Sequence, residues 1–406
     1  MPIDLSNRRH PEDSKAGSDR PIYLDYNATT PHDPEVIAAM LPYLEEQFGN
    51  PSSSHWYGVQ TRMAVEEARC QVAAFLDCQP DEIVFTSGGT ESNNHAVKGV
   101  AWSRRERGNH IVTSQIEHPA VIEVCKALEQ DGFRISYLPV DELGQVSLSE
   151  FENTLRQDTI LVTIMHANNE VGTAQPIEAI ARLARERGIA VHTDAAQSAG
   201  KIPTDVEVLG VDLLSIAGHK LYAPKGVGAL YVRKGIQLAK LLHGASQEGG
   251  WRPGTENVLE IVGLGKACEV AHRDLTIHQV HMKKMRDLLE QRLRQEVRDV
   301  RINGHPEQRL PNTLSISFHG LDAAALLNAM APSVAASAGA ACHSGGLHLS
   351  HVLKAMDLPV EWAQGTVRLS TGRMTTQADI ERAVQVLAES VVRMRKLSAA
   401  AHGRKP

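Results

Sequence analysis

Three polar motifs each follow a short apolar run that is rich in valine or isoleucine. The motifs are Gly88-Gly89-Thr90 after IVFTS, Asp194 with Gln197 after IAVHT, and His219-Lys220 after DLLSIAG. Glycines and the free N–H groups at the start of a helix can bind a phosphate group. A carboxylate can hold a protonated ring nitrogen, and a lysine buried at a strand end is a candidate for Schiff-base chemistry.

Each motif also has an ordinary structural interpretation when it stands alone. A Gly-Gly pair is more often only a turn, Asp194 could be a helix N-cap, and Lys220 could be a surface lysine. Together, in this order on successive strands, the motifs supply the parts that bind pyridoxal 5'-phosphate (PLP). The combination therefore predicts a PLP site.

Cys342 lies in a run of small residues, SAGAACHSGG (337–346). Such a run has no bulky anchor, which suits a mobile loop with an exposed thiol. The other cysteines stand in helix-like stretches, where a buried position is usual: Cys70, Cys78, Cys125 and Cys268. An alternative takes as metal ligands Cys342, His343, His348 and His351. Their spacing matches no common zinc pattern, so we expect no metal site.

Two further side chains are candidates for the same site. His118 follows the apolar run NHIVTS (109–114), which places it at the same edge of the expected sheet. Arg368 lies in TVRLSTGR (366–373), where it is either a solvated strand residue or a fork for a substrate carboxylate.

Short apolar runs alternate with helical patterns up to about residue 260. The runs lie at 81–88, 109–114, 160–167, 188–195, 212–218 and 228–233. This alternation predicts an α/β unit with a mostly parallel sheet covered on both faces. Ligands of such sheets bind beyond the carboxyl ends of the strands, where the polar motifs stand.

A different pattern begins near residue 265. It consists of a long charged helix (267–297), half-buried strands (314–318 and 366–370) and a last helix (377–395). We therefore expect a large PLP-binding domain at 21–265 and a smaller α+β domain at 266–395 that carries the Cys342 loop. The first residues of the large domain could instead join the smaller one. Residues 1–20 are predicted to form a disordered tail and 396–406 a flexible tail.

Composition excludes several classes of function. The 406 residues carry 42 basic and 48 acidic side chains, and a net charge of −6 gives no large cationic surface for nucleic acid. No run has the length of a membrane span, and the N-terminus lacks the apolar stretch of a secretory signal. Five cysteines form no disulfide framework. We expect a cytoplasmic protein that binds neither membrane nor nucleic acid directly.

Longer stretches resemble the cysteine desulfurase and selenocysteine lyase family of PLP enzymes. They are YLDYNATTP (23–31), FGNPSSSH (48–55), FTSGGTESNN (85–94), EHPAV (117–121), HANNEVGT (166–173), VHTDAAQSAGK (191–201), GHKLYAPKGVGALYVR (218–233), WRPGTENV (251–258), LPNTLS (310–315), AGAACHSG (338–345) and VRLSTGRMTT (367–376). The resemblance implies fold type I, with a mainly parallel seven-stranded sheet in the large domain and a smaller α+β domain.

The same resemblance implies roles for single residues. Lys220 matches the lysine that carries the cofactor, Asp194 the partner of the ring nitrogen, and Gln197 the donor to the phenolic oxygen. His118 matches the residue that stacks on the ring and moves protons, and Cys342 the cysteine that accepts sulfur.

The remaining matches concern the phosphate and the substrate. Gly89, Thr90 and His219 match residues that contact the phosphate. Thr255 matches a further phosphate contact, which the neighbouring subunit of a homodimer donates. The residues beside the cofactor and the substrate carboxylate match Asn169 and Arg368, with Asn27 nearby. Ala217 departs from the serine of many bacterial desulfurases, which removes one hydroxyl from the phosphate cup.

These matches predict a cysteine desulfurase. It would convert L-cysteine to L-alanine and leave the sulfur on Cys342 as a persulfide for an acceptor protein, as in iron–sulfur cluster assembly. Three alternatives stay open. AACHS and RPGTEN look more like a selenocysteine lyase, which releases selenide from L-selenocysteine. An aminotransferase or decarboxylase can share the fold, and a scaffold without PLP that docks sulfur acceptors would not be an enzyme.

Overall fold

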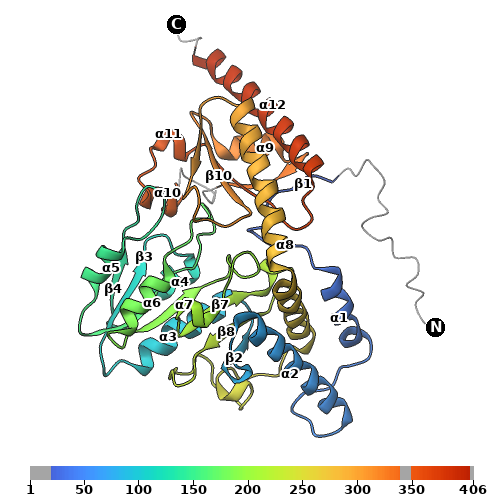
Figure 1. The fold of residues 1–406 in the computed structure, drawn as a ribbon, viewed down its shortest axis with the longest axis vertical. Coiled ribbons are helices and arrows are strands. Elements are labelled where there is room, and N and C mark those ends of the chain that lie inside the picture. The colour runs from blue at the N-terminus through green and yellow to red at the C-terminus, as the bar shows by residue number, and fades with distance from the viewer. Residues whose placement is uncertain (1–19, 339–348, 403–406) are drawn as a thin grey trace, which may run out of the picture.

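The computed structural model describes residues 20–338 and 349–402. The loop residues Cys342, His343 and His348 lie outside the described residues, as does most of the predicted N-terminal tail. The described chain forms a large sheet, a smaller four-stranded sheet and a two-stranded ribbon, with helices around them (Figure 1).

The large sheet has seven strands and is mainly parallel, as predicted. Its order is β2 (Ile83–Thr86), β8 (Gly228–Val232), β7 (Leu213–Ala217), β6 (Ala190–Asp194), β5 (Thr159–Thr163), β3 (His110–Ser114) and β4 (Arg134–Leu138). Within it, β8 is antiparallel to both of its neighbours, and the pairs from β7 to β4 are parallel. Each of the expected apolar runs corresponds to a strand whose residues are all buried.

Alternate residues of these strands face two separate cores, so both faces of the sheet are covered. Ile111 and Leu213 point to the core shared with α3 (Gly89–Ser103) and α4 (Pro119–Gln130). Val112 and Leu214 point to the opposite core. The helices of that core include α2 (Trp56–Leu76), α6 (Ile177–Arg185), α7 (Val206–Leu209) and the first part of α8 (Val258–Glu296).

The smaller sheet is antiparallel. Its order is β12 (Ser337–Ala338), β13 (Thr366–Ser370), β10 (Thr313–Phe318) and β9 (Val300–Asn303). The remaining α-helices of the described residues are α1 (Pro34–Glu45), α5 (Leu148–Thr154), α9 (Ala323–Met330), α10 (His351–Ala355), α11 (Val360–Ala363) and α12 (Gln377–His402). Helix α12 thus continues beyond its predicted end at 395.

The start of the described chain lies with the C-terminal elements. Strand β1 (Ile22–Tyr23) pairs with β11 (Val334–Ala335), and Leu24 belongs to the same core as β10 and α12. Figure 1 shows the blue β1 beside orange and red elements. The chain then crosses to the large sheet, so the residues after β1 lie between the two sheets.

Helix α8 begins at Val258, earlier than the sequence pattern predicted. Gly263 and Gly265 interrupt that pattern, but both are sites of close packing. A Cβ at Gly265 would lie 2.6 Å from the Cα of Ala68 in α2, and one at Gly263 would lie 2.8 Å from the Sδ of Met40 in α1. The two glycines therefore let α8 pack closely against both α1 and α2 while α8 itself stays continuous.

The same helix connects the two cores (Figure 1). Leu264 and Cys268 belong to the core of the large sheet, and Leu289 and Leu293 belong to the core of the small sheet. We propose that the division between the large and the small unit falls within α8, near the boundary at 265/266. None of the helices in the described ranges combines the length and the apolar character that a membrane span needs.

Candidate active site

A cavity of about 290 Å³ lies at the carboxyl ends of the parallel strands. It is lined by ten of the predicted residues: Asn27, Gly89, Thr90, His118, Asn169, Asp194, Gln197, His219, Lys220 and Arg368. Thr255 is exposed and does not line it, and Cys342 lies outside the described residues. The structure thus brings together residues that are up to 341 positions apart, because 368 − 27 = 341.

The N-terminus of α3 forms one end of the cavity. Its N-cap, Gly88, has a φ of 143° and provides no side-chain cap for the N–H groups that follow. A Cβ at Gly89 would lie 3.3 Å from the Cβ of Ala217 at the end of β7, so a larger residue would narrow this end. The N–H groups and the hydroxyl of Thr90 suit an anion such as phosphate.

His219 stands at the same end of the cavity. Its Nδ1 lies 3.3 Å from the Oγ1 of Thr29. Burial, together with the positive charge of Lys220, lowers the pKa of His219 to about 4. The ring is therefore neutral at physiological pH, so that it can contribute a hydrogen bond but no charge.

Asp194 is the last residue of β6, and two donors hold its carboxylate. The Nδ2 of Asn93 donates to Oδ2 at 2.7 Å, and the main-chain N–H of Ala196 donates to Oδ1 at 2.9 Å. The side chain of Asp194 is only 6% exposed. A buried carboxylate that is oriented in this way suits a protonated ring nitrogen. Sequence reasoning missed Asn93, although it lies in the FTSGGTESNN stretch.

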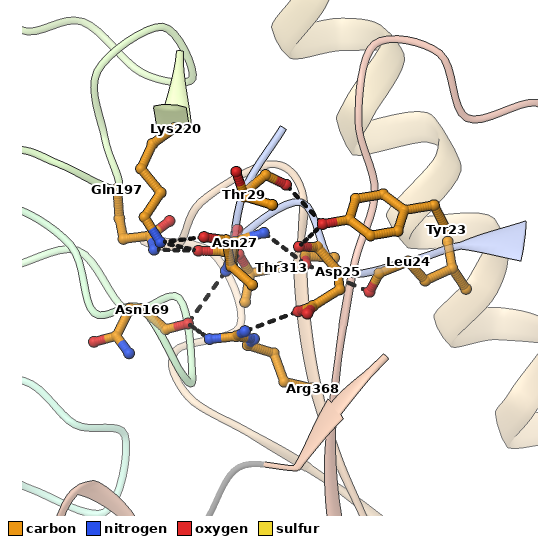
Figure 2. A network of polar contacts seen from close by, with 12 residues as sticks. Tyr23, Leu24, Asp25, Asn27, Thr29, Asn169, Gln197, Lys220, Thr313 and Arg368 are labelled. Atoms are coloured by element: carbon orange, nitrogen blue, oxygen red, sulfur yellow. Dashed lines mark hydrogen bonds and ion pairs between the residues drawn. The ribbon is translucent and has the colours of Figure 1, made fainter. Parts of the chain in front are cut away.

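Lys220 lies opposite the main chain of Asn27. Its Nζ donates to the main-chain oxygens of Asn27 and, at 2.9 Å, of Ala28 (Figure 2). Burial lowers the pKa of Lys220 to about 8, and the nearby charge of Arg368 acts in the same direction. An appreciable fraction of this amine is therefore neutral, and hence nucleophilic, near pH 7.

His118 caps helix α4 and faces the cavity. Its Nδ1 accepts a hydrogen bond of 3.1 Å from the N–H of Ala120, which places the proton of the neutral ring on Nε2. Removal from bulk water lowers the pKa of His118, and the carboxylate of Asp194 opposes this shift. The arrangement leaves an N–H group of His118 for the cavity.

Arg368 enters from the smaller sheet. Its Nη1 donates to the main-chain oxygen of Asn169 and its Nη2 to the Oδ1 of Asp25, both at 2.9 Å (Figure 2). The Nδ2 of Asn27 donates to the same Asn169 oxygen at 3.2 Å. Sequence reasoning missed Asp25, which stands in the YLDYNATTP stretch. The guanidinium is thus oriented by one group near the N-terminus and one from the middle of the chain.

Two buried ionisable residues behind the cavity wall were also missed. The carboxyl group of Glu117 accepts from the hydroxyl of Ser114 at 2.6 Å and from the main-chain N–H of Met165 at 3.0 Å, and burial raises its pKa to about 8. Lys201 is 3% exposed and donates to the side chain of Gln197. In the sequence, Glu117 directly precedes His118, and Lys201 is the last residue of VHTDAAQSAGK (191–201). Neither residue belongs to a pattern that predicts a buried ionisable group.

The alternative metal site has one described member, His351. Its Nε2 lies 2.9 Å from the main-chain oxygen of Glu117. Within residues 20–338 and 349–402, no three histidine, cysteine or acidic side chains are grouped so that they could hold a metal ion.

The large sheet, the smaller sheet and the cavity between them define an α/β enzyme of fold type I, the class of PLP-dependent transferases. The aminotransferase class-V family matches residues 22–383, and the chain belongs to this family, whose members depend on PLP.

The chain is similar to cysteine desulfurases in sequence and in structure. A cysteine desulfurase IscS of Dictyoglomus turgidum is 48% identical over 380 residues, which cover 93% of this chain and 96% of that protein. The solved structure of a NifS-like protein is 40% identical with a TM-score of 0.86, and the match covers 91% of this chain and 98% of that one. A structure of SspA in complex with cysteine is 37% identical with a TM-score of 0.77, covering 87% and 99%. The family expected from the sequence is confirmed.

Proposed function

We propose that this chain is a PLP-dependent cysteine desulfurase that converts L-cysteine to L-alanine. The observation that carries the proposal is that Lys220, Asp194 and the N-terminus of α3 face one cavity. The similarity to proteins named cysteine desulfurases over more than nine tenths of the chain supports the same reaction.

The donors and acceptors of the cavity fit PLP. Lys220 would bind the aldehyde carbon, Asp194 the ring nitrogen and Gln197 the phenolic oxygen, while Thr90 and His219 would hold the phosphate with the N–H groups of α3. The carboxylate of Asp194, buried and already oriented, is the feature that best matches a cationic ring. When bound, PLP supplies an electron-accepting ring that weakens the bonds to the α-carbon of an amino acid.

The protein's own side chains bind the substrate and move its protons. Arg368 binds the α-carboxylate through its planar fork, beside the main-chain oxygen of Asn169 that the side-chain amide of Asn27 also contacts. The neutral amine of Lys220 takes the α-proton, for which a pKa of about 8 is suitable. His118 presents its Nε2–H to the cavity and holds a proton near the substrate thiol.

Cys342 is proposed as the sulfur acceptor. Its thiolate attacks the sulfur of the substrate, the carbon–sulfur bond breaks, and the bonding electrons remain on the carbon that becomes the methyl group of alanine. The persulfide then passes to a sulfur-acceptor protein. The described chain resumes at residue 349, and the Nε2 of His351 lies 2.9 Å from the main-chain oxygen of Glu117, next to His118.

A homodimer would complete the site. Phe48 and Tyr57 stack with ring centroids 5.3 Å apart, and the ring of Trp56, which is 66% exposed, meets that of Tyr57 edge-on. Met63, which is 62% exposed, lies seven residues after Trp56 in α2 and hence on the same side of that helix, so these four residues are taken as one exposed apolar patch. A neighbouring groove is lined from both Ser52 and the segment 246–256, which carries Thr255. We propose that a second copy of the chain covers this patch. Thr255 of each copy would then reach the phosphate end of the cavity in the other copy.

Location in the cytoplasm remains a prediction from the sequence.

Peptide mapping tests the assignment of the cofactor-binding lysine. PLP is added to the purified protein, the adduct is reduced with borohydride, and the labelled peptide is identified by mass spectrometry. Lys201 serves as an internal control because it also lies at Asn27 but behind the cavity wall. Label on Lys220 alone, and its loss in Lys220→Ala, is the expected result. Label on Lys201, or no stable label, would contradict the proposal.

A further inference from the structure

Lys201 is an unusual residue for a protein interior. It is 3% exposed, and none of the ion pairs among the described residues includes it. A buried amine without a carboxylate partner costs free energy, because it loses its hydration without gaining a counter-charge. Such a residue needs a compensating role, and its contacts indicate one.

Both acceptors of the Lys201 amine belong to residues that line the cavity. Its Nζ lies 2.9 Å from the Oε1 of Gln197 and 3.4 Å from the Oδ1 of Asn27. The Oδ1 of Asn27 has a second and closer donor, the Nδ2 of Asn312 at 2.9 Å. The contact that depends most on Lys201 is therefore the one with Gln197.

This contact and the bond to Asn27 together fix the orientation of the Gln197 side-chain amide. Lys201 can donate, so the oxygen of Gln197 turns toward it. The nitrogen then lies 2.9 Å from the main-chain oxygen of Asn27, which can only accept. An amide nitrogen has two N–H groups, and the bond to Asn27 uses one of them. The second is left for the cavity that Gln197 lines.

We propose that Lys201 is a positioning residue that holds the Gln197 amide so that an N–H donor, and not the carbonyl oxygen, meets the phenolic oxygen of PLP. The inference rests on the proposed function, because it requires PLP in the cavity. Burial lowers the pKa of Lys201 well below its ordinary value. Both the ammonium and the neutral amine carry N–H groups, so either form can hold the oxygen of Gln197.

A double-mutant cycle with a spectroscopic readout tests this role. The visible absorbance of the PLP-loaded enzyme is titrated with pH in the unmodified protein, Lys201→Met, Gln197→Ala and the double variant. A donor to the phenolic oxygen stabilises its ionised form, so loss of the donor raises the midpoint. Lys201→Met should raise it by on the order of one pH unit, the size of one hydrogen bond to a charged group.

The control is Lys225→Met, which removes the same charge from an exposed residue near His219. It should leave the midpoint unchanged. The double variant should match Gln197→Ala alone, because Lys201 acts through Gln197. Melting curves of the apoproteins check the fold. If Lys201→Met does not fold, the same cycle is measured with Lys201→Gln, whose side chain ends one bond short of the lysine nitrogen.

The outcomes separate this inference from the proposed function. An unchanged midpoint in Lys201→Met overturns the inference, as do additive shifts in the double variant, which would mean that Lys201 acts by its charge and not through Gln197. If the unmodified protein develops no visible absorbance with PLP, the proposed function fails, and the inference fails with it. A normal spectrum with a failed cycle overturns the inference alone.

Discussion

The Nη2 of Arg368 donates to the Oδ1 of Asp25 at 2.9 Å, across 343 residues of sequence. Strand β13 is thereby connected to the segment that follows β1, at the junction of the two sheets. The side chain of Arg368 is oriented before any substrate arrives, and such preorganisation lowers the cost of binding a carboxylate.

Asp25→Asn should therefore weaken the binding of L-cysteine. We expect KM to rise on the order of tenfold with kcat nearly unchanged, because one charge-assisted hydrogen bond to Arg368 is lost. Steady-state kinetics of alanine formation measure both constants. Asp33→Asn is the matched control, since Asp33 pairs with Arg373 at 3.2 Å and does not line the cavity. An unchanged KM in Asp25→Asn would contradict this role.

The strand-end residues were predictable from the sequence because of the geometry of parallel sheets. Asp194 ends a strand with a plain apolar run, and Lys220 and His118 each follow such a strand. Parallel strands present their carboxyl ends at one edge of the sheet. Asn27 and Arg368 come from outside this sheet. Only the resemblance to a family placed Asn27 in the site, and the sequence pattern around Arg368 left open whether it was a solvated strand residue or a fork for a carboxylate.

The partners of these residues were not predictable. Asp25, Asn93 and Lys201 act through contacts with residues far apart in sequence or across a turn, and their types alone are ordinary. The early start of α8 was also missed, because glycine usually weakens a helix and its packing role at Gly265 depends on Ala68 of another helix. Strand β4 was missed because its residues are mostly only half-buried.

The capture of PLP by the apoprotein should depend on pH with a midpoint near 8. Burial and Arg368 lower the pKa of Lys220 to about 8, so the reactive neutral amine accumulates as the pH rises through that value. Stopped-flow absorbance after mixing with PLP measures the rate. Arg368→Gln removes the positive charge that helps to lower the pKa of Lys220, so it should move the midpoint to a higher pH. A midpoint near the ordinary value for lysine, about 10.4, would contradict the assignment.

Glu117 should make the folded protein less stable as the pH rises. Its pKa is raised from 4.5 to about 8 in the folded state, so between these values the folded protein holds a proton that the unfolded chain releases. Relative to Glu117→Gln, the unmodified protein should lose up to about 1.4 kcal/mol of unfolding free energy per pH unit between about 5 and 8.

Urea unfolding of both apoproteins at several pH values measures this difference. Glu123→Gln is the control, because Glu123 lies on α4, the helix that begins two residues after Glu117, and its side chain is 65% exposed. If the unfolding free energies of Glu117→Gln and of the unmodified protein differ by the same amount at every pH, Glu117 does not hold the proton.

The apolar patch of Phe48, Trp56, Tyr57 and Met63 should support the dimer. Trp56→Glu places a charge in the centre of the proposed interface, and we expect the dissociation constant to rise at least about tenfold. Sedimentation equilibrium measures the constant. Ile277→Glu alters an equally exposed apolar residue on α8 and should leave it unchanged. If both variants sediment like the unmodified protein, this patch is not the interface.

A parallel turnover assay tests the proposed function most directly. The purified protein, loaded with PLP and supplied with a reductant, is given L-cysteine or L-selenocysteine, and alanine is quantified together with sulfide or selenide. Cys342→Ala is measured beside it. We predict steady alanine formation from L-cysteine that is abolished in Cys342→Ala. Alanine from L-selenocysteine alone, with full activity in Cys342→Ala, would contradict a desulfurase and establish a selenocysteine lyase.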